Sequence, residues 1–147
     1  MYVCQLMHQP VIAVSPQDSI SEAAQLLKKH RVGMLPVCQA GRLCGVITDR
    51  DLVTRGLASG IPPEKCPVRQ VMTQQITCVT PDTELSVATY LMAKHKLRRL
   101  PVVQESQVVG MLSLGDLALA RPYSMEVAQT LAEISKEDVF SLPQLQS

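Results

Sequence analysis

An internal repeat constrains this 147-residue chain more than any other feature of its sequence. Residues 45–51 and 110–116 share one pattern: glycine, two apolar residues, a hydroxyl residue, two variable residues and aspartate. The offset of 65 positions holds without a gap from Val3 to Leu52 of the first copy. Such a long match at one offset indicates a tandem duplication. The fold must therefore contain two copies of one unit.

The repeated pattern predicts a strand that leads directly into a helix. Its two apolar residues are typical of the end of a buried strand, and Thr48 or Ser113 is typical of a helix N-cap. Anions bind readily at a helix N-terminus, where unpaired N–H groups gather. The spacing from the hydroxyl residue to Asp51 or Asp116 also matches a capping box, which stabilises the helix alone. Both interpretations stay open at this point.

Each copy predicts the order strand, helix, strand, strand, helix. In the first copy we expect an extended piece at 11–14, a helix from a Ser19/Glu22 capping box to His30, and strands at 35–38 and 43–47. The buried face of this helix is predicted to hold Ile20, Ala23, Ala24 and Leu27. A turn at Ala40-Gly41 separates the strands, and Gly56 is the expected stop of the second helix.

The second copy predicts the same elements in the same order. We expect an extended piece at 76–79, a helix ending at His95, strands at 100–103 and 108–112, and a last helix from Ser113. The helix face equivalent to that of the first copy holds Leu85, Ala88, Thr89 and Met92. Because His30 and His95 recur at equivalent places, we interpret both as helix ends and not as ligands.

The predicted organisation has four parts: a first motif at 1–56, a linker at 57–67, a second motif at 68–121, and a C-terminal helix and tail at 122–147. The last helix is expected from about Ser124 to Ser135, with an apolar face of Val127, Ala128, Leu131 and Ile134. This helix covers an edge of its own chain or swaps onto a partner subunit. The final dozen residues are expected to fray.

Composition excludes several classes of function. The formal net charge of +1 provides no electrostatic case for nucleic acid or a membrane surface, and no apolar run is long enough to span a bilayer. The five cysteines form no C-x-x-C pair, and the three histidines are scattered, so we expect no metal site. Cys38 and Cys44 are expected to pack within strands. Free thiols indicate a reducing, cytoplasmic location.

Together these motifs resemble a tandem pair of cystathionine-β-synthase (CBS) domains, known as a Bateman module, standing alone without an enzyme. The resemblance covers about residues 3–120 and rests on the duplication, on His-x-x-x-x-Leu-Pro-Val at 30–37 and 95–102, and on the aspartate pattern in both halves. It implies an α+β fold in which two β-α-β-β-α units pack through their sheets about a pseudo-twofold axis and leave two clefts. It also implies a homodimer formed through helices.

The resemblance implies adenosine ligands in these clefts: AMP, ADP, ATP, S-adenosylmethionine or, in some members, cyclic dinucleotides. Asp51 and Asp116 would accept hydrogen bonds from the ribose hydroxyls, and Thr48 and Ser113 would donate to phosphate. In related modules each cleft combines both halves. The Asp116 cleft would then place adenine against Ile12, Val32, Gly33 and Met111, and the Asp51 cleft would use Thr77, Leu97, Arg98 and Val46.

One difference distinguishes the two predicted clefts. The second half carries Arg98-Arg99 before its Leu-Pro, where the first half carries Gly33-Met34. These arginines could pair with phosphates, as could Arg50, so the Asp51 cleft is expected to suit a phosphorylated ligand. A solvated strand edge for the arginine pair, and an exposed helix position for Arg50, are the structural alternatives. In our mechanistic hypothesis, such a ligand draws the arginine pair towards Thr48 and rotates the subunits.

Three classes of function compete for this sequence. The first is a regulatory module that senses an adenosyl ligand, for example in energy sensing, and passes a conformational change to a downstream protein. The second is a dimerisation or interaction scaffold with unused clefts. The third is an enzyme, which we do not expect, because no nucleophile–base pair, paired acids or metal constellation can be placed in the sequence. No catalytic cofactor is expected either.

Overall fold

In the computed structural model, which describes residues 1–120 and 124–141, the chain divides into two compact units. Unit 1 contains Met1–Gln9, Thr77–Val102 and the chain from Gly110 onward, and unit 2 contains Pro10–Ile76 and Val103–Val109. Each unit therefore combines segments of both sequence copies. The first nine residues lie with the second copy, and the segment that follows residue 67 lies with the first copy.

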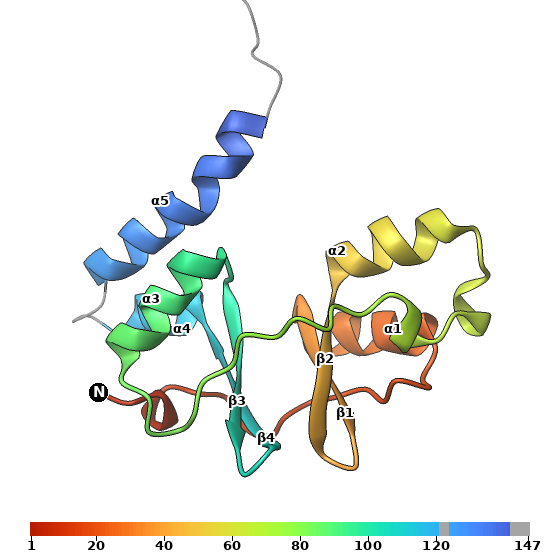
Figure 1. Ribbon diagram of the computed structural model, residues 1–147, viewed down its shortest axis with the longest axis horizontal. Helices are drawn as coiled ribbons and strands as arrows, with labels where there is room; N and C mark the ends of the chain where they lie inside the picture. Colours follow the sequence, from red (N-terminus) through yellow and green to blue (C-terminus); the bar gives the residue numbers. More distant parts are fainter. Residues whose placement is uncertain (121–123, 142–147) are drawn as a thin grey trace, which may run out of the picture. The chain divides into compact units, whose positions relative to one another are not determined.

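The first copy is built around the helix α1 and the hairpin of β1 and β2 (Figure 1). Its elements are η1 (Val3–Gln5), α1 (Ile20–His30), β1 (Met34–Gln39), β2 (Arg42–Thr48), α2 (Asp49–Asp51), η2 (Leu52–Gly56), η3 (Leu57–Ser59) and η4 (Pro63–Lys65). The second copy repeats the helix, hairpin and helix, with η5 (Val68–Gln70), α3 (Leu85–His95), β3 (Arg99–Gln104), β4 (Gln107–Ser113), α4 (Leu114–Leu119) and α5 (Ser124–Ser141). The predicted α+β class is confirmed.

The strands form a four-stranded sheet in the order β1-β2-β4-β3. β1 and β2 are antiparallel, with Met34 opposite Thr48 at the open end. Their connection at Ala40-Gly41 has positive φ at both residues, 54° and 79°, which is the conformation favoured in two-residue hairpin loops. The predicted turn is therefore confirmed. Within unit 2, Arg42 of β2 pairs with Gln107, the first residue of β4.

The first helix of each copy begins and ends as predicted. Ser19 caps α1 and forms the expected capping box with Glu22, and α3 ends at His95. All four predicted apolar-face residues of α3 are buried. In α1 the prediction for Ala24 is wrong, because the buried stripe runs through Ile20, Ala23 and Leu27 and leaves Ala24 exposed.

The extended pieces at 11–14 and 76–79 are shorter than a strand. Each makes a single parallel bridge, from Val14 to Val37 in one copy and from Val79 to Val102 in the other. Val14 is hydrogen-bonded on both sides of this bridge, to Pro36 O (3.1 Å) and from Cys38 N (2.8 Å). The ladder cannot continue through the prolines of this segment or of the facing strand, because proline has no N–H to donate.

The prediction that Gly56 ends the second helix is wrong. The helical backbone continues through η2, a π-helical turn, and through η3 to Ser59, and Gly60 with φ 78° ends it. Gly56 instead lies against α1, where an added Cβ would come within 2.7 Å of Ile20 Cδ1. Close packing, and not a left-handed backbone, explains glycine at this position.

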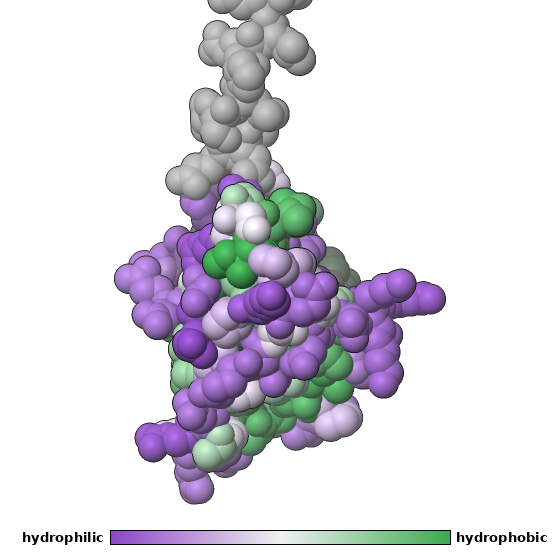
Figure 2. Space-filling view, turned by 90° about the vertical axis from the view of Figure 1, so that its right-hand side faces the viewer, coloured by the Kyte–Doolittle hydropathy of each residue, from purple (hydrophilic) through white to green (hydrophobic). Residues whose placement is uncertain are grey.

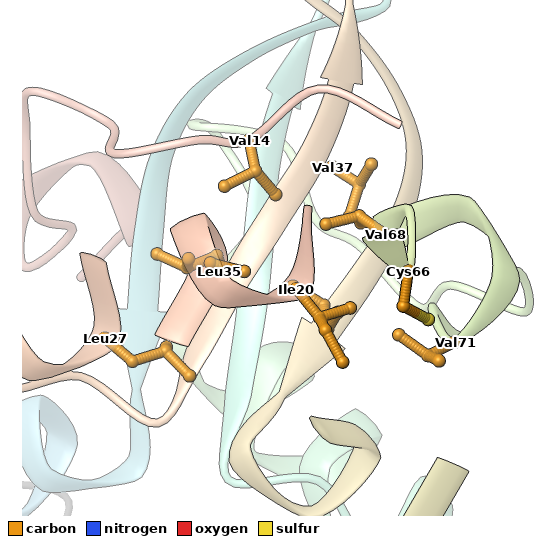
Figure 3. Packing of buried hydrophobic residues seen from close by; sticks show 10 residues of the cluster. Val14, Ile20, Leu27, Leu35, Val37, Cys66, Val68 and Val71 are labelled. Carbon is orange, nitrogen blue, oxygen red and sulfur yellow. The ribbon is translucent and has the colours of Figure 1, made fainter. Parts of the chain in front are cut away.

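The hydrophobic core of unit 2 joins the helix, the hairpin and the segment after residue 60 (Figure 3). Cys66, Val68 and Val71 pack against side chains of α1 and β1, and Cys66 O accepts a hydrogen bond from Ile20 N (2.9 Å). The labelled members of this cluster are Val14, Ile20, Leu27, Leu35, Val37, Cys66, Val68 and Val71. The start of the second sequence copy thus completes the core of the first.

Within unit 1, α5 packs against α3 and α4 of its own chain. Among the side chains of α5 that the structure describes, Val127, Thr130 and Ile134 are buried. The predicted apolar face is therefore partly wrong, because Ala128 and Leu131 are exposed, and the packing turns the helix towards Thr130. The helix continues past the predicted end near Ser135 to Ser141, so the prediction of fraying is wrong for residues 136–141, and residues 142–147 lie outside the described part of the chain. Among the described residues, no helix is long and apolar enough to cross a membrane.

Replacing Leu35 with alanine is expected to lower the free energy of unfolding by about 2–5 kcal/mol, because the change removes a fully buried side chain and leaves a cavity. Urea unfolding followed by circular dichroism measures this loss. Leu57→Ala is the matched control: Leu57 is 66% exposed, so the same change there should cost less than about 0.5 kcal/mol. Equal losses in the two variants would contradict the assignment of Leu35 to the core.

The five cysteines are all free in the structure, and their rates of alkylation are expected to differ. Burial raises the pKa of Cys38 and of Cys44, with the neighbouring Cys44 thiol adding to the rise at Cys38. A raised pKa lowers the thiolate fraction, and the thiolate is the nucleophile. At about pH 8, iodoacetamide should therefore modify the exposed Cys4 and Cys78 before the two strand cysteines. Peptide mapping by mass spectrometry measures the order, and equal rates would refute it.

Candidate functional site

The junction between β2 and α2 is closed by a pair of reciprocal hydrogen bonds. Thr48 Oγ1 accepts a hydrogen bond from Asp51 N (3.1 Å), and Asp51 Oδ2 accepts one from Thr48 N (3.1 Å). Ser113 and Asp116 make the same two bonds at the start of α4, at 3.1 and 2.9 Å. The capping interpretation is therefore confirmed in both copies. Each cap holds one carboxylate oxygen, Oδ2, and leaves Oδ1 outside the box.

A second segment crosses the last strand of each copy beside this junction. Thr73 exchanges two backbone hydrogen bonds with Val46 of β2 (3.0 and 2.8 Å), and His8 exchanges two with Met111 of β4 (2.8 and 3.2 Å). His8 and Thr73 are equivalent residues of the two sequence copies. The crossing segments therefore come from the start of the other sequence copy but lie in the same compact unit as the aspartate.

Glycine as the first residue of the repeated pattern leaves room for the crossing segment, which lies directly on it. An added Cβ at Gly45 would come within 2.7 Å of Met72 Sδ and 3.1 Å of Thr73 O. At Gly110 it would come within 2.7 Å of Met7 Sδ and 3.2 Å of His8 O. A larger residue would force the methionine side chain to move and would press on the backbone oxygen of Thr73 or His8.

Around Asp51 the contacts to the second carboxylate oxygen are long. Thr73 Oγ1 lies 3.4 Å from Oδ1 and 3.3 Å from Oδ2. Arg55, one helical turn after Asp51, places Nε 4.0 Å from Oδ1, and its guanidinium also donates to the backbone oxygens of Val71 and Met72. Asp51 is 8% exposed. A nearly buried carboxylate thus keeps an oxygen that no short hydrogen bond occupies among the described contacts.

Around Asp116 the corresponding oxygen is occupied. His8 Nε2 lies 2.5 Å from Asp116 Oδ1, which is a short hydrogen bond and becomes an ion pair when the imidazole is protonated. The Asp116 side chain is 15% exposed, whereas that of His8 is 71% exposed. The position equivalent to Arg55 is Ala120, so no arginine stands one turn after this aspartate.

The predicted site residues divide evenly between the two units. Unit 2 holds Ile12, Val32, Gly33, Val46, Thr48, Arg50 and Asp51, and unit 1 holds Thr77, Leu97, Arg98, Arg99, Met111, Ser113 and Asp116. The predicted clefts each mix residues of both groups, so their composite arrangement stays a prediction.

Within each unit, the residue two places before the Leu-Pro pair lies beside its own aspartate motif. Gly33 O accepts a hydrogen bond from Asp49 N (3.1 Å), and Arg98 O accepts one from Leu114 N (2.8 Å). The side chains of Arg50 and Arg98 are exposed and that of Arg99 is half-buried. A role for the arginines with phosphate, and the movement of the arginine pair towards Thr48, stay predictions.

Sequence reasoning missed the residues that contact the carboxylates from outside the motif. His8 and Thr73 lie inside the gapless repeat, one residue after the equivalent pair Met7 and Met72. The signal that could have found them is the change from histidine to threonine at equivalent positions, directly after a methionine that both copies share. Arg55, four residues after Asp51, fits the usual i,i+4 spacing of an ion pair on a helix.

A shallow polar hollow lies elsewhere on unit 2. It encloses about 350 Å³ and is lined by Gln17, Ser19, Glu64, Lys65, Cys66, Pro67, Arg69 and Gln70. None of the predicted nucleotide-binding residues is among them. In residues 1–120 and 124–141, no group of three or more histidine, cysteine, aspartate or glutamate side chains is placed to hold a metal ion.

Comparison with known proteins identifies the repeated unit. The family model for the CBS domain matches residues 3–57 and again residues 68–123. The chain belongs to the CBS domain family. It is 39% identical over 133 residues to the CBS domain-containing protein YhcV of Bacillus subtilis, a match that covers 90% of this chain and 94% of that relative. The resemblance to a tandem CBS pair is thus confirmed.

Solved CBS structures share the fold of this chain. A CBS domain protein from Pyrobaculum aerophilum, complexed with AMP, matches with a TM-score of 0.77 and 26% identity over 88% of this chain and 99% of that one. The CBS domain pair of protein MJ0100, in complex with 5′-methylthioadenosine and S-adenosyl-L-methionine, matches with a TM-score of 0.73 and 27% identity over 86% and 98%. CBS pairs similar to this chain therefore bind adenosyl compounds.

Replacing Thr48 with alanine is expected to lower the free energy of unfolding by about 0.5–2 kcal/mol, because Asp51 N loses its cap. Thr48→Ser should keep most of the stability, since it retains the hydroxyl. Thr54→Ala is the matched control: it removes the same atoms from an exposed helical residue, so its effect should stay near zero. Chemical unfolding of the three variants measures the difference. If Thr48→Ala matches Thr54→Ala, the hydroxyl does not cap the helix.

Proposed function

We propose that the protein is a regulatory module that binds an adenosyl ligand through Asp51 and Asp116. The observation that carries this proposal is the repeated placement of a nearly buried aspartate at a strand-to-helix junction, with one carboxylate oxygen held by the cap. A carboxylate has about four lone-pair sites, so the capped Asp51 retains capacity for the hydroxyl groups of a ribose. The CBS structures with AMP and with S-adenosyl-L-methionine support the ligand class.

A binding role agrees better with these residues than a catalytic one. In both copies the hydroxyl group accepts a hydrogen bond from the backbone N–H of the aspartate and holds the helix start, and among the described residues it makes no hydrogen bond to a basic side chain. The proposal therefore assigns no enzyme activity and no catalytic cofactor to this chain. It also includes neither nucleic acid nor a membrane as partner.

The proposal includes a cytoplasmic homodimer that a downstream protein recognises. Large apolar side chains are exposed on the helices of both units: Val53, Leu57, Val87, Tyr90, Leu119 and Met125. Figure 2 shows apolar surface (green) lying among hydrophilic side chains on one face. Helical apolar surface of this kind is available for subunit contact. ADP, ATP and cyclic dinucleotides remain candidate ligands beside AMP and S-adenosylmethionine, and energy sensing is the expected role for the nucleotides.

The function is tested by thermal unfolding with AMP, ADP, ATP, S-adenosylmethionine, 5′-methylthioadenosine and cyclic di-AMP, with GTP as the control for the base. At 100 times its dissociation constant a ligand stabilises the folded state by about 2.7 kcal/mol, which raises Tm by several degrees. One adenosyl compound should produce this shift, and the double variant Asp51→Asn, Asp116→Asn should lose it. Asp49→Asn, on the same turn but exposed, should keep it.

The outcome also separates the two remaining classes of function. If none of the adenosyl compounds stabilises the protein, the sensor proposal fails. The scaffold then remains, in which the apolar helical surface binds a partner and the clefts bind no ligand. Light scattering coupled to size-exclusion chromatography, with and without the binding compound, reports the dimer in either case. If Asp49→Asn loses binding together with the double variant, the carboxylates are not the specific contacts.

A further inference from the structure

We propose that His8 makes Asp116 the weaker of the two ligand sites, because it occupies the oxygen of Asp116 that a ribose hydroxyl needs. The inference rests on the proposed function, in which Asp51 and Asp116 bind ribose. It assigns a selectivity role to His8, a residue outside the repeated motif. Asp51 is then the site of higher affinity and Asp116 the site of lower affinity.

His8 and Thr73 have equivalent backbone positions in the two units. Both residues exchange two hydrogen bonds with the last strand of their own unit, at Met111 and at Val46. Each lies next to a methionine that packs on the glycine of the motif. The two sites therefore differ through the side chain at this position and not through the path of the backbone.

The side chains of His8 and Thr73 make different contacts with the two carboxylates. At Asp116, the cap bond to Oδ2 is 2.9 Å and the His8 bond to Oδ1 is 2.5 Å, so both oxygens already have a close donor. At Asp51, the cap bond to Oδ2 is 3.1 Å, while the described residues nearest to Oδ1 that could donate to it are Thr73 at 3.4 Å and Arg55 at 4.0 Å. A ribose hydroxyl can approach Asp51 Oδ1 without breaking a short hydrogen bond.

Binding at Asp116 requires His8 to move. The imidazole must give up a short hydrogen bond before a diol takes its place, and the free energy of that bond is subtracted from the affinity. Because the His8 side chain is 71% exposed, it has room to leave, and solvent reduces the strength of the contact. We therefore expect a lower affinity at Asp116, by a factor of about three to ten, and not a closed site.

Reciprocal substitutions in single-site backgrounds test this inference. Asp51→Asn leaves the Asp116 site, and Asp116→Asn leaves the Asp51 site; calorimetric titration with AMP, or with whichever adenosyl compound stabilises the wild type, then gives one Kd for each. His8→Thr in the first background should tighten binding about threefold to tenfold. Thr73→His in the second should weaken binding by a similar factor. His95→Thr, the same substitution at an exposed helix end, should leave Kd unchanged.

The outcomes separate this inference from the proposed function. If His8→Thr leaves the Kd at Asp116 unchanged or weakens it, His8 does not compete with the ligand and the inference is wrong, although the sensor remains. If no adenosyl compound binds the wild type, the proposed function fails first. Nitrogen-15 NMR of the His8 ring needs no ligand: its shifts should change in Asp116→Asn and stay constant in Asp51→Asn. Identical ring shifts in both variants would overturn the inference, and the melting temperature of each variant confirms that it is folded.

Discussion

A hydrogen bond from the backbone N–H of Thr48 or Ser113 to the carboxylate of the aspartate three residues later organises both candidate sites. This bond fixes the direction in which the last strand of each copy passes into its helix. It also orients the carboxylate and engages one of its oxygens. A single side chain therefore starts a helix and presents an acceptor, and the second role exists because a carboxylate has more lone pairs than a cap uses.

The exchange of segments between the sequence copies supplies the side chains that reach each carboxylate from the other copy, Thr73 at Asp51 and His8 at Asp116. The nine residues before Pro10 lie with the second copy, and residues up to Ile76 lie with the first. Each crossing segment packs its methionine on a motif glycine and brings one further side chain to the aspartate. In unit 2 the same part of the chain also contributes Val68 and Val71 to the core. The core and the candidate site of that unit are thus completed by one piece of chain.

A duplication makes the differences between its halves informative. Both halves keep the glycine, the cap and the aspartate, so these residues perform the shared task. Position 8/73 is histidine in one copy and threonine in the other, and position 55/120 is arginine in one copy and alanine in the other. Both differences change the polar environment of the same carboxylate. Two sites with a common backbone can therefore respond differently to one ligand.

Features that depend on short spacings could be predicted from the amino-acid sequence. The repeat, the capping boxes at Ser19, Thr48 and Ser113, and the turn at Ala40-Gly41 were all predictable, because each rests on hydrogen bonds or backbone angles within a few residues. The family was predictable for the same reason, since its motifs are local and recur at one offset.

Contacts between residues that are distant in the chain could be known from the tertiary structure alone. The contact between His8 and Asp116 spans 108 positions, and that between Thr73 and Asp51 spans 22. Packing also decided that Gly56 lies against Ile20 while Gly60 ends the helix, and that Thr130 is buried in place of Ala128. No local pattern encodes such choices, because they depend on the shape of the surface on which each element packs.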